Sequence, residues 1–473
     1  MDVRYNLIQW VHRATRGWSY GASIADPRTG EIIKGQVTLG SLRVRQDYLI
    51  AEGLLAPYEQ GKPHNPEMEK MALARLRQLA AHEVGHTLGL QHNFAASVHG
   101  RASVMDYPPP YVKLSGPGAP DLSDAYAVGI GEWDKAAIAY GYRDFPPGAD
   151  EAKLLDGMLR DTARSGLIFI SDSDARPEGS AHPQAHLWDS GTNAVDELNR
   201  IMQVRARALS RFGENNARAG APWATLEDVL VPAYLYHRYQ TEAAAKVLGG
   251  LYYTYALRGD GQTVISAIPA AEQRRAIDAL LSTIRADALT LPPALIDSIP
   301  PRPIGYPRTR EDFQNRTGLT FDPVGAAESA ANITISLILN RERAARLVEH
   351  HSRDRNMPGL DEVIDRLLAA TWKAAPPEGL AAEVQRAIDS VALYHLMVLA
   401  RDEAAPEQVR AIAWAKLHDL KSSISLTGLP FDQGAHLAYA VDRIARFEAN
   451  PKEVPLPKPV EPPPGQPIGC GME

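Results

Sequence analysis

The sequence predicts an α+β fold in which a small mixed sheet and one long helix are followed by a mainly α-helical region. Three observations predict it. In the first 60 residues, stretches rich in β-forming side chains alternate with a period of two. After Asn65 the apolar residues recur every three or four positions, and from Ser123 onward nearly every long stretch, rich in Ala, Leu and Arg, has helical periodicity.

Two strands are expected near the start of the chain. Residues 3–11 are rich in β-forming side chains, and residues 31–39 alternate between two faces, with Gly35 and Val37 on one of them. Residues 26–30, Asp-Pro-Arg-Thr-Gly, form the turn before the second strand.

One helix is expected to begin at Asn65, and none is predicted before it. Asn65 can cap the helix, and Pro66 suits its first turn because a missing backbone N–H costs nothing there. The apolar periodicity continues to about Leu88, and the helix is expected to end at Gly89.

The rest of the chain is expected to contain helices in two groups. A Pro-rich segment, residues 291–303, separates the groups, and we expect it to lie on the surface. The last 23 residues hold eight prolines, which predicts an extended, poorly ordered tail. Helices are expected near residues 152–164, 193–212, 225–257, 270–290, 326–352, 359–373, 379–402, 406–420 and 433–448.

Composition excludes several classes of protein. The net charge of −7 gives no basic surface for phosphates, so no nucleic acid partner is expected. The single cysteine, Cys470, cannot form an internal disulfide. No segment approaches 18 consecutive apolar residues, so no membrane-spanning segment is predicted, and the first residues lack the pattern of a secretory signal.

Three histidines have the spacing of metal ligands. His82 and His86 are four residues apart, so on a helix both imidazoles project from one face and can bind one ion. Catalytic zinc takes three protein ligands and keeps one position open. His92 can return to the same ion if the chain turns sharply at Gly89, because glycine adopts positive φ without strain. One Zn²⁺ ion is therefore expected.

Glu83 lies beside the two helical histidines and is the expected general base. Zinc lowers the pKa of a bound water molecule toward about 7 and polarises a carbonyl group. A carboxylate is ionised at neutral pH, so it can take the proton of that water and pass it to a leaving amine. The residues favour a hydrolase that acts on amide bonds.

The pattern His-Glu-x-x-His-x-x-Gly-x-x-His resembles the zinc motif of the metzincin clan of metalloproteases. Met105, thirteen residues after His92, resembles the methionine of the Met-turn, and the resemblance implies a hydrophobic floor beneath the imidazoles. Tyr107 is placed like a tyrosine that in some branches approaches the metal or stabilises the tetrahedral intermediate. Pro109, in the proline run that follows, would form a wall of the pocket for a substrate side chain.

The strand at residues 31–39 looks like the edge strand along which metzincins align a polypeptide substrate, so Gly35 and Val37 are expected to bind it. An edge strand offers unpaired backbone N–H and C=O groups to an extended peptide. An interior strand without a ligand is the alternative interpretation.

Most of the chain is also similar to a bacterial family of large zinc metalloproteases, in which a metzincin domain precedes a long helical region. Members of that family are usually exported, which implies a periplasmic or extracellular protein. The similarity rests on residues 30–32, on the expected helix that carries His82 and His86 (here called the zinc helix), and on the segments 123–129, 132–134, 234–250 and 300–306. The expected division is a catalytic domain at 1–145, helical regions at 146–295 and 296–450, and a Pro-rich tail at 451–473.

The N-terminal part departs from the metzincin pattern. A metzincin domain normally opens with a strand and a long helix, and both are expected to be missing, as in a truncated catalytic domain or a fragment of a longer precursor. A sheet without its backing helix would leave an apolar face in water.

A second histidine pair, His182 and His186, also has metal-like spacing. Pro183 argues against a regular helix there, so a polar loop or a contact between domains is the favoured interpretation over a second metal site.

Three functions are compatible with these residues. The leading one is a zinc endopeptidase that acts on extended polypeptide. The second is a catalytically impaired, zinc-stabilised binding or scaffold fragment of a longer protease. The third is an amide hydrolase with the same ligands and a small-molecule substrate.

Overall fold

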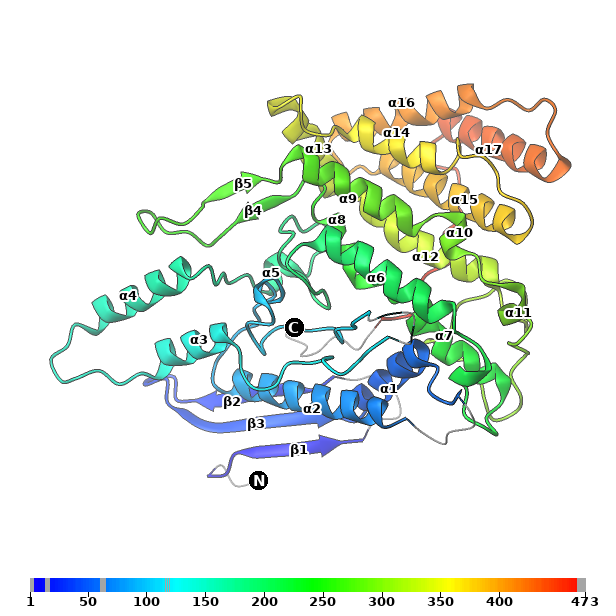
Figure 1. Cartoon of the computed structure of the whole chain (residues 1–473). Helices are drawn as coiled ribbons and strands as arrows, with labels where there is room; N and C mark the ends of the chain where they lie inside the picture. Colours follow the sequence, from blue (N-terminus) through cyan, green and yellow to red (C-terminus); the bar gives the residue numbers. More distant parts are fainter. Residues whose placement is uncertain are drawn as a thin grey trace.

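The structure, a computed structural model, describes residues 4–12, 18–59, 65–114, 116, 118 and 120–465. A small sheet and two helices form one end of the molecule, and stacked helices form the other (Figure 1). The predicted α+β class is confirmed. Val3 of the first predicted strand and Cys470 lie outside the described residues.

Among the described residues, three strands form the N-terminal sheet in the order β1-β3-β2. They are β1 (Leu7–Val11), β2 (Tyr20–Ala25) and β3 (Ile32–Gly40), with β1 parallel and β2 antiparallel to β3. The expectation that residues 31–39 form an edge strand is wrong, because β3 pairs on both sides. Alternation reveals which face a residue occupies, whereas the number of neighbouring strands depends on the rest of the sheet.

Helix α1 (Leu42–Leu55) corrects the expectation that no helix precedes Asn65. The hydrophobic pattern of the sequence does not reveal this helix, because its buried face is not purely apolar. Arg43 and Asp47 lie one turn apart in the interior, with Nη2 and Oδ1 at 2.7 Å, and this ion pair interrupts the hydrophobic stripe.

Helix α2 (Pro66–Thr87) confirms the predicted zinc helix to within one residue. The side chain of Asn65 accepts a hydrogen bond of 2.9 Å from the backbone N–H of Glu67, as an N-cap does. Met68, Met71 and Leu79 are buried on its inner face. The helix packs against α1 and against strands β2 and β3, so the sheet supports the segment that carries the histidines.

Helices dominate the remainder of the chain, as predicted, but three of the expected stretches are divided. Residues 225–257 contain two helices and the first strand of a hairpin, and residues 270–290 and 326–352 each contain a break between two helices. The early elements are α3 (Glu132–Tyr142), α4 (Glu151–Arg164), α5 (Asp172–Ala175), α6 (Ala194–Leu209), α7 (Leu226–Tyr234), α8 (Arg238–Ala245), β4 (Leu251–Tyr253) and β5 (Ile265–Ala267). The later helices are α9 (Ala270–Thr283), α10 (Ala286–Leu289), α11 (Pro293–Ile296), α12 (Pro323–Ile338), α13 (Arg341–Arg353), α14 (Leu360–Ala370), α15 (Leu380–Arg401), α16 (Glu407–Ser423) and α17 (Phe431–Ala449).

The largest hydrophobic core contains residues from Val195 to Phe447. It includes Leu291, Leu295 and Ile299 of the Pro-rich segment, so that segment is partly interior rather than a surface connection. Helix α12 lies in the middle of this core and packs against α15 and α8. The predicted boundary between the two helical regions therefore falls inside one continuous core.

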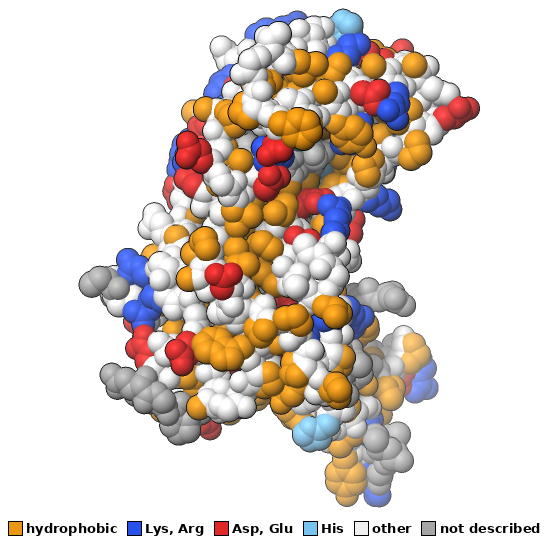
Figure 2. Space-filling model, turned by 90° about the vertical axis from the view of Figure 1, so that its right-hand side faces the viewer, with side chains coloured by type: hydrophobic (Ala, Val, Ile, Leu, Met, Phe, Trp, Pro, Cys, Tyr) orange, Lys and Arg blue, Asp and Glu red, His pale blue; other side chains and the backbone are white. Residues whose placement is uncertain are grey.

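Some hydrophobic side chains are exposed on the small sheet. Ile8, Trp10 and Ile24, on the two edge strands, are at least 42% exposed. Figure 2 shows hydrophobic side chains gathered across the middle of another face of the molecule. Within the described part of the chain, no single helix is long and apolar enough to cross a membrane.

Candidate metal centre

Helix α2 presents two of the three candidate ligands. His82 and His86 stand one turn apart, and their Nε2 atoms are 3.1 Å from each other. The two rings meet edge to face, with an interplanar angle of 88°. Both imidazoles therefore point one nitrogen at a common position beside the helix.

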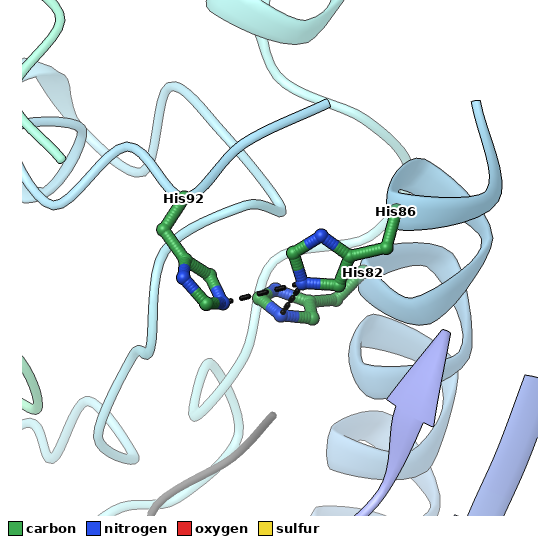
Figure 3. Close-up of side chains that lie close together, drawn as sticks. All are labelled: His82, His86 and His92. Carbon is green, nitrogen blue, oxygen red and sulfur yellow. Dashed lines mark hydrogen bonds between the residues drawn. The ribbon is translucent and has the colours of Figure 1, made fainter. Parts of the chain in front are cut away.

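The chain turns back immediately after α2. Gly89 has φ +83°, in the left-handed region that glycine adopts without strain. The turn brings His92 back, and its Nε2 atom lies 3.2 Å from Nε2 of His86 (Figure 3). The candidate ligand atoms of the three histidines all lie within 4.8 Å of one another.

The second nitrogen of each ring is held by an acceptor. Nδ1 of His82 donates to the carbonyl oxygen of Val104 at 2.7 Å, and Nδ1 of His86 donates to that of Leu90 at 2.9 Å. Nδ1 of His92 donates to Oδ2 of Asp172 at 2.8 Å. Because each Nδ1 carries the hydrogen, each neutral ring has its lone pair on Nε2, the atom that faces the common position.

Burial keeps His82 and His86 neutral. Burial, followed by the neighbouring imidazoles His86 and His92, lowers the pKa of His82 well below its ordinary value. Burial, followed by His92, lowers the pKa of His86 to about 4. Neutral imidazoles are the form that binds zinc, and tetrahedral zinc holds nitrogens about 3.3 Å apart, close to the separations found here. The donor set therefore fits a zinc ion.

Met105 is fully buried. Its sulfur occupies the space beside Gly85, where a Cβ would lie only 2.4 Å from Sδ. The turn around it is held by Asp134, whose carboxylate accepts hydrogen bonds from Oγ of Ser103 at 2.6 Å and from N–H of Val104 at 2.8 Å. The role of Met105 as the methionine of a Met-turn stays a prediction.

Tyr107 adds a hydroxyl group to the centre. Its Oη lies 3.0 Å from Nε2 of His92 and accepts a hydrogen bond of 3.3 Å from Nη2 of Arg176. Arg176 also pairs with Asp172 through its Nε. Burial raises the pKa of the Asp172 carboxyl, but hydrogen bonds from His92 and Arg176 outweigh it and hold that pKa below its ordinary value. A connected polar network thus runs from the histidines to α5.

Glu83 is completely buried on α2, next to His82. Strand β2 crosses the helix at this point, because a Cβ on Gly21 would lie 1.9 Å from the backbone oxygen of Glu83. Gly35 and Val37 are buried in the central strand β3, and Gly35 faces Thr87 of α2. They were expected to bind substrate because β3 was expected to be an edge strand, and β3 pairs on both sides. The strand edge nearest the centre belongs to β2.

Pro109 lies between two pockets near the centre. One is lined by Trp188 and Tyr236, among others, and the second by Asp106 and Tyr111. This position of Pro109 is compatible with the prediction that it forms a wall of the pocket for a substrate side chain.

The second histidine pair does not form a comparable cluster. Nε2 of His182 donates to the carbonyl oxygen of Tyr253 at 2.9 Å, and Nε2 of His186 lies 3.2 Å from Glu242. Among the described residues, the one group of three or more His, Cys, Asp or Glu side chains that could hold a metal ion is His82, His86 and His92.

Sequence reasoning missed the residues that support the site from a distance. Asp172 is the first residue of α5, Arg176 directly follows its last residue, and Asp134 belongs to α3. The one local signal at α5 is Ser171 before an acidic first turn, a pattern that marks a helix start and not a metal centre. Their roles depend on how the chain folds back over the site.

A small mixed sheet, a long helix with two histidines and a returning third histidine define a metzincin-type, zinc metalloprotease-like domain. A family model described as Met-zincin matches residues 64–379, more than half of the chain. The chain belongs to the Met-zincin family. Searches among curated proteins and among solved structures found no match. The family match and the cluster of three histidines together indicate a zinc-binding, metalloprotease-like function.

Proposed function

We propose that the protein is a zinc-dependent endopeptidase in which His82, His86 and His92 hold one catalytic zinc ion. The observation that carries this proposal is the convergence of three Nε2 atoms, each belonging to a ring whose Nδ1 is already engaged by an acceptor. Three fixed neutral nitrogens leave a fourth position for water or substrate, as catalytic zinc requires.

Glu83 is the general base of the proposed reaction. Bound zinc would supply Lewis acidity, which lowers the pKa of water and polarises the peptide carbonyl. Glu83 takes the proton of the attacking water and delivers it to the leaving nitrogen, a double role that suits a carboxylate beside the metal ligands. Its complete burial keeps bulk water from competing for the proton.

Tyr107 stabilises the oxyanion of the tetrahedral intermediate. Its hydroxyl lies 3.0 Å from Nε2 of His92 and accepts a hydrogen bond from Arg176. When a metal ion takes the lone pair of that Nε2, the hydroxyl hydrogen becomes available to a substrate oxygen. A donor fixed before the reaction stabilises negative charge as it develops on the carbonyl oxygen. The cationic Arg176 strengthens that donor.

The substrate binds as an extended strand along β2. Among the described strands, β2 is an edge of the sheet, and it crosses α2 at Glu83, so its outer side lies next to the proposed reacting centre. Pro109 would contribute the wall of an adjacent side-chain pocket. An extended polypeptide satisfies both features, whereas a small amide would use neither.

The experiment is to measure zinc content and cleavage of unfolded casein and of a peptide library. We expect about one zinc per chain, cleavage that EDTA abolishes, and loss of both in His86→Ala. Cys470→Ser is tested in parallel, because it removes the only thiol that could compete for the metal. One zinc per chain without cleavage by either protein would contradict an endopeptidase and favour a zinc-stabilised binding fragment.

A further inference from the structure

Two pockets flank Pro109, and the chain itself enters one of them. Pro464 and Gly465 line the pocket beside Trp188. A Cβ on Gly465 would lie 1.8 Å from Oη of Tyr239, so the chain fits tightly there. The Pro-rich tail, predicted to be poorly ordered, is thus packed against the body of the molecule up to residue 465.

The second pocket, here named the acidic pocket, has a volume of about 460 Å³, and no described residue of the tail lines it. Its walls include Gln78, Val104, Asp106, Asp124 and Asp189. It lies beside the candidate metal centre, because the carbonyl oxygen of Val104 accepts hydrogen bonds from Nε2 of Gln78 at 3.0 Å and from Nδ1 of His82 at 2.7 Å. A side chain that enters this pocket therefore belongs to a substrate residue close to the scissile bond.

The charged lining of the acidic pocket is mostly negative. Three aspartates and one arginine, Arg101, line it. Arg101 is already paired, since its Nη1 lies 3.2 Å from Oδ1 of Asp124 and both side chains are partly exposed. Asp106 and Asp189 are the two interior carboxyls, each 4% exposed. Among the described residues, no other cationic side chain lines the pocket to balance them.

Two buried acceptors in the lining have no donor. Oδ1 of Asp189 and Oε1 of Gln78 have no hydrogen-bond partner in the part of the chain that the structure describes. Gln78 is only 6% exposed, so its oxygen is not an ordinary solvated group. Buried polar atoms are almost always hydrogen-bonded, and an apolar side chain could satisfy neither oxygen. The two acceptors therefore indicate a ligand that donates hydrogen bonds.

The two interior carboxyls also disfavour each other's negative charge. Burial, followed by the charge of Asp189, raises the pKa of Asp106 well above its ordinary value. Burial raises the pKa of Asp189 to about 7, although the charge of Lys246 opposes this shift. Nζ of Lys246 donates to the carbonyl oxygens of Ala175 and Ala185, both at 2.7 Å. A cationic group that enters the pocket would interact favourably with both carboxylates.

We propose that the acidic pocket binds an arginine or lysine side chain of the substrate, so that the protein cleaves polypeptides beside a basic residue. This inference rests on the proposed endopeptidase function and narrows its substrate class. The guanidinium group of arginine brings five N–H donors, enough for Oδ1 of Asp189, Oε1 of Gln78 and the carboxylate of Asp106. The aliphatic stem of either side chain suits the apolar wall that Val104 and Pro109 provide.

The first test compares matched peptides. Arginine and citrulline have similar shapes, but only arginine is charged. The zinc-loaded protein is given peptides that carry one or the other at each position on either side of the cleaved bond. At a position adjacent to that bond, kcat/KM should be at least about tenfold higher for arginine. Cleavage with equal kcat/KM at every position would overturn this inference alone.

A pair of variants links the preference to the pocket. Asp189→Asn keeps the size of the side chain and removes its charge, so it should bring the arginine-to-citrulline ratio of kcat/KM close to one. Asp287→Asn, which changes an exposed ion pair with Arg285, is the matched control and should keep the wild-type ratio. Zinc content is measured on the same samples. An undiminished ratio in Asp189→Asn at wild-type zinc content would overturn the role of the pocket.

Binding without cleavage separates this inference from the proposed function. The zinc-loaded Glu83→Gln protein should bind the arginine peptide at least about tenfold more tightly than the citrulline peptide in calorimetry. If wild type cleaves no peptide while this difference in affinity is found, the endopeptidase is contradicted and the basic-residue pocket is supported. No cleavage together with equal affinities would overturn both.

Discussion

Nδ1 of His92 lies 2.8 Å from Oδ2 of Asp172, a residue eighty positions further along the chain. The third candidate ligand is therefore oriented by helix α5 and not by its own loop. Such second partners fix the tautomer and the direction of a ligating imidazole.

Replacing Asp172 with Ala should weaken zinc binding about 10- to 100-fold, because Nδ1 of His92 loses its acceptor. The measurement is a competition titration with a zinc chelator. The control is Asp174→Ala, whose carboxylate accepts hydrogen bonds from Tyr253 and Tyr255 and contacts no histidine of the cluster. Equal zinc affinity in wild type and Asp172→Ala would refute this supporting role.

Tyr107→Phe should lower kcat about 100-fold at unchanged zinc content, because it removes one preorganised donor and keeps the ring in place. KM should change little. Tyr140→Phe, on the exposed side of α3, serves as the control. If both variants cleave peptide at the wild-type rate, Tyr107 is a packing residue.

Gly85→Ala should destabilise the fold by about 1–3 kcal/mol, because the new methyl group would meet Sδ of Met105 at 2.4 Å. Urea unfolding measures the loss. Adding Met105→Val should recover part of it by freeing that space. Gly141→Ala, on a helix with open space around the position, should not destabilise. A Gly85→Ala protein as stable as wild type would show that the packing is loose.

Stability should fall in acid partly because of His395. Burial lowers the pKa of His395 to about 4 in the folded chain, against 6.5 as its ordinary value. Between these two pKa values the unfolded chain binds more protons at His395 than the folded chain does. The contribution of neutral, buried His395 to stability is therefore fully present above pH 6.5 and is lost as the pH falls toward 4.

The depressed pKa of His395 should lower the free energy of unfolding in acid by at most about 3 kcal/mol. The free energy of unfolding of His395→Gln should decline less steeply from pH 6.5 to 4.5 than that of wild type. Parallel declines would mean that His395 is protonated equally in both states.

The zinc helix and its turn were predictable because their determinants are local. The four-residue spacing of His82 and His86 puts both on one helix face, and positive φ at Gly89 follows from the absence of a Cβ. The N-cap at Asn65 is likewise a matter of adjacent residues.

The errors have a different origin. The buried pair of Arg43 and Asp47 replaced the apolar stripe of α1, so periodicity missed a helix that tertiary contacts stabilise. The central place of β3 depends on which strands pair with it, and Asp172 reaches His92 only after the chain has folded back. Neither relationship leaves a pattern in neighbouring residues.

The central claim is that Glu83 performs proton transfer beside a zinc ion held by three histidines. Its most direct test compares Glu83→Gln with wild-type Glu83, both in the Cys470→Ser background so that no thiol competes for the metal. Zinc content and kcat for a library-derived peptide are measured on the same samples. We predict one zinc per chain in both proteins and a kcat at least about 100-fold lower in Glu83→Gln. Equal kcat values at equal zinc content would contradict the claim.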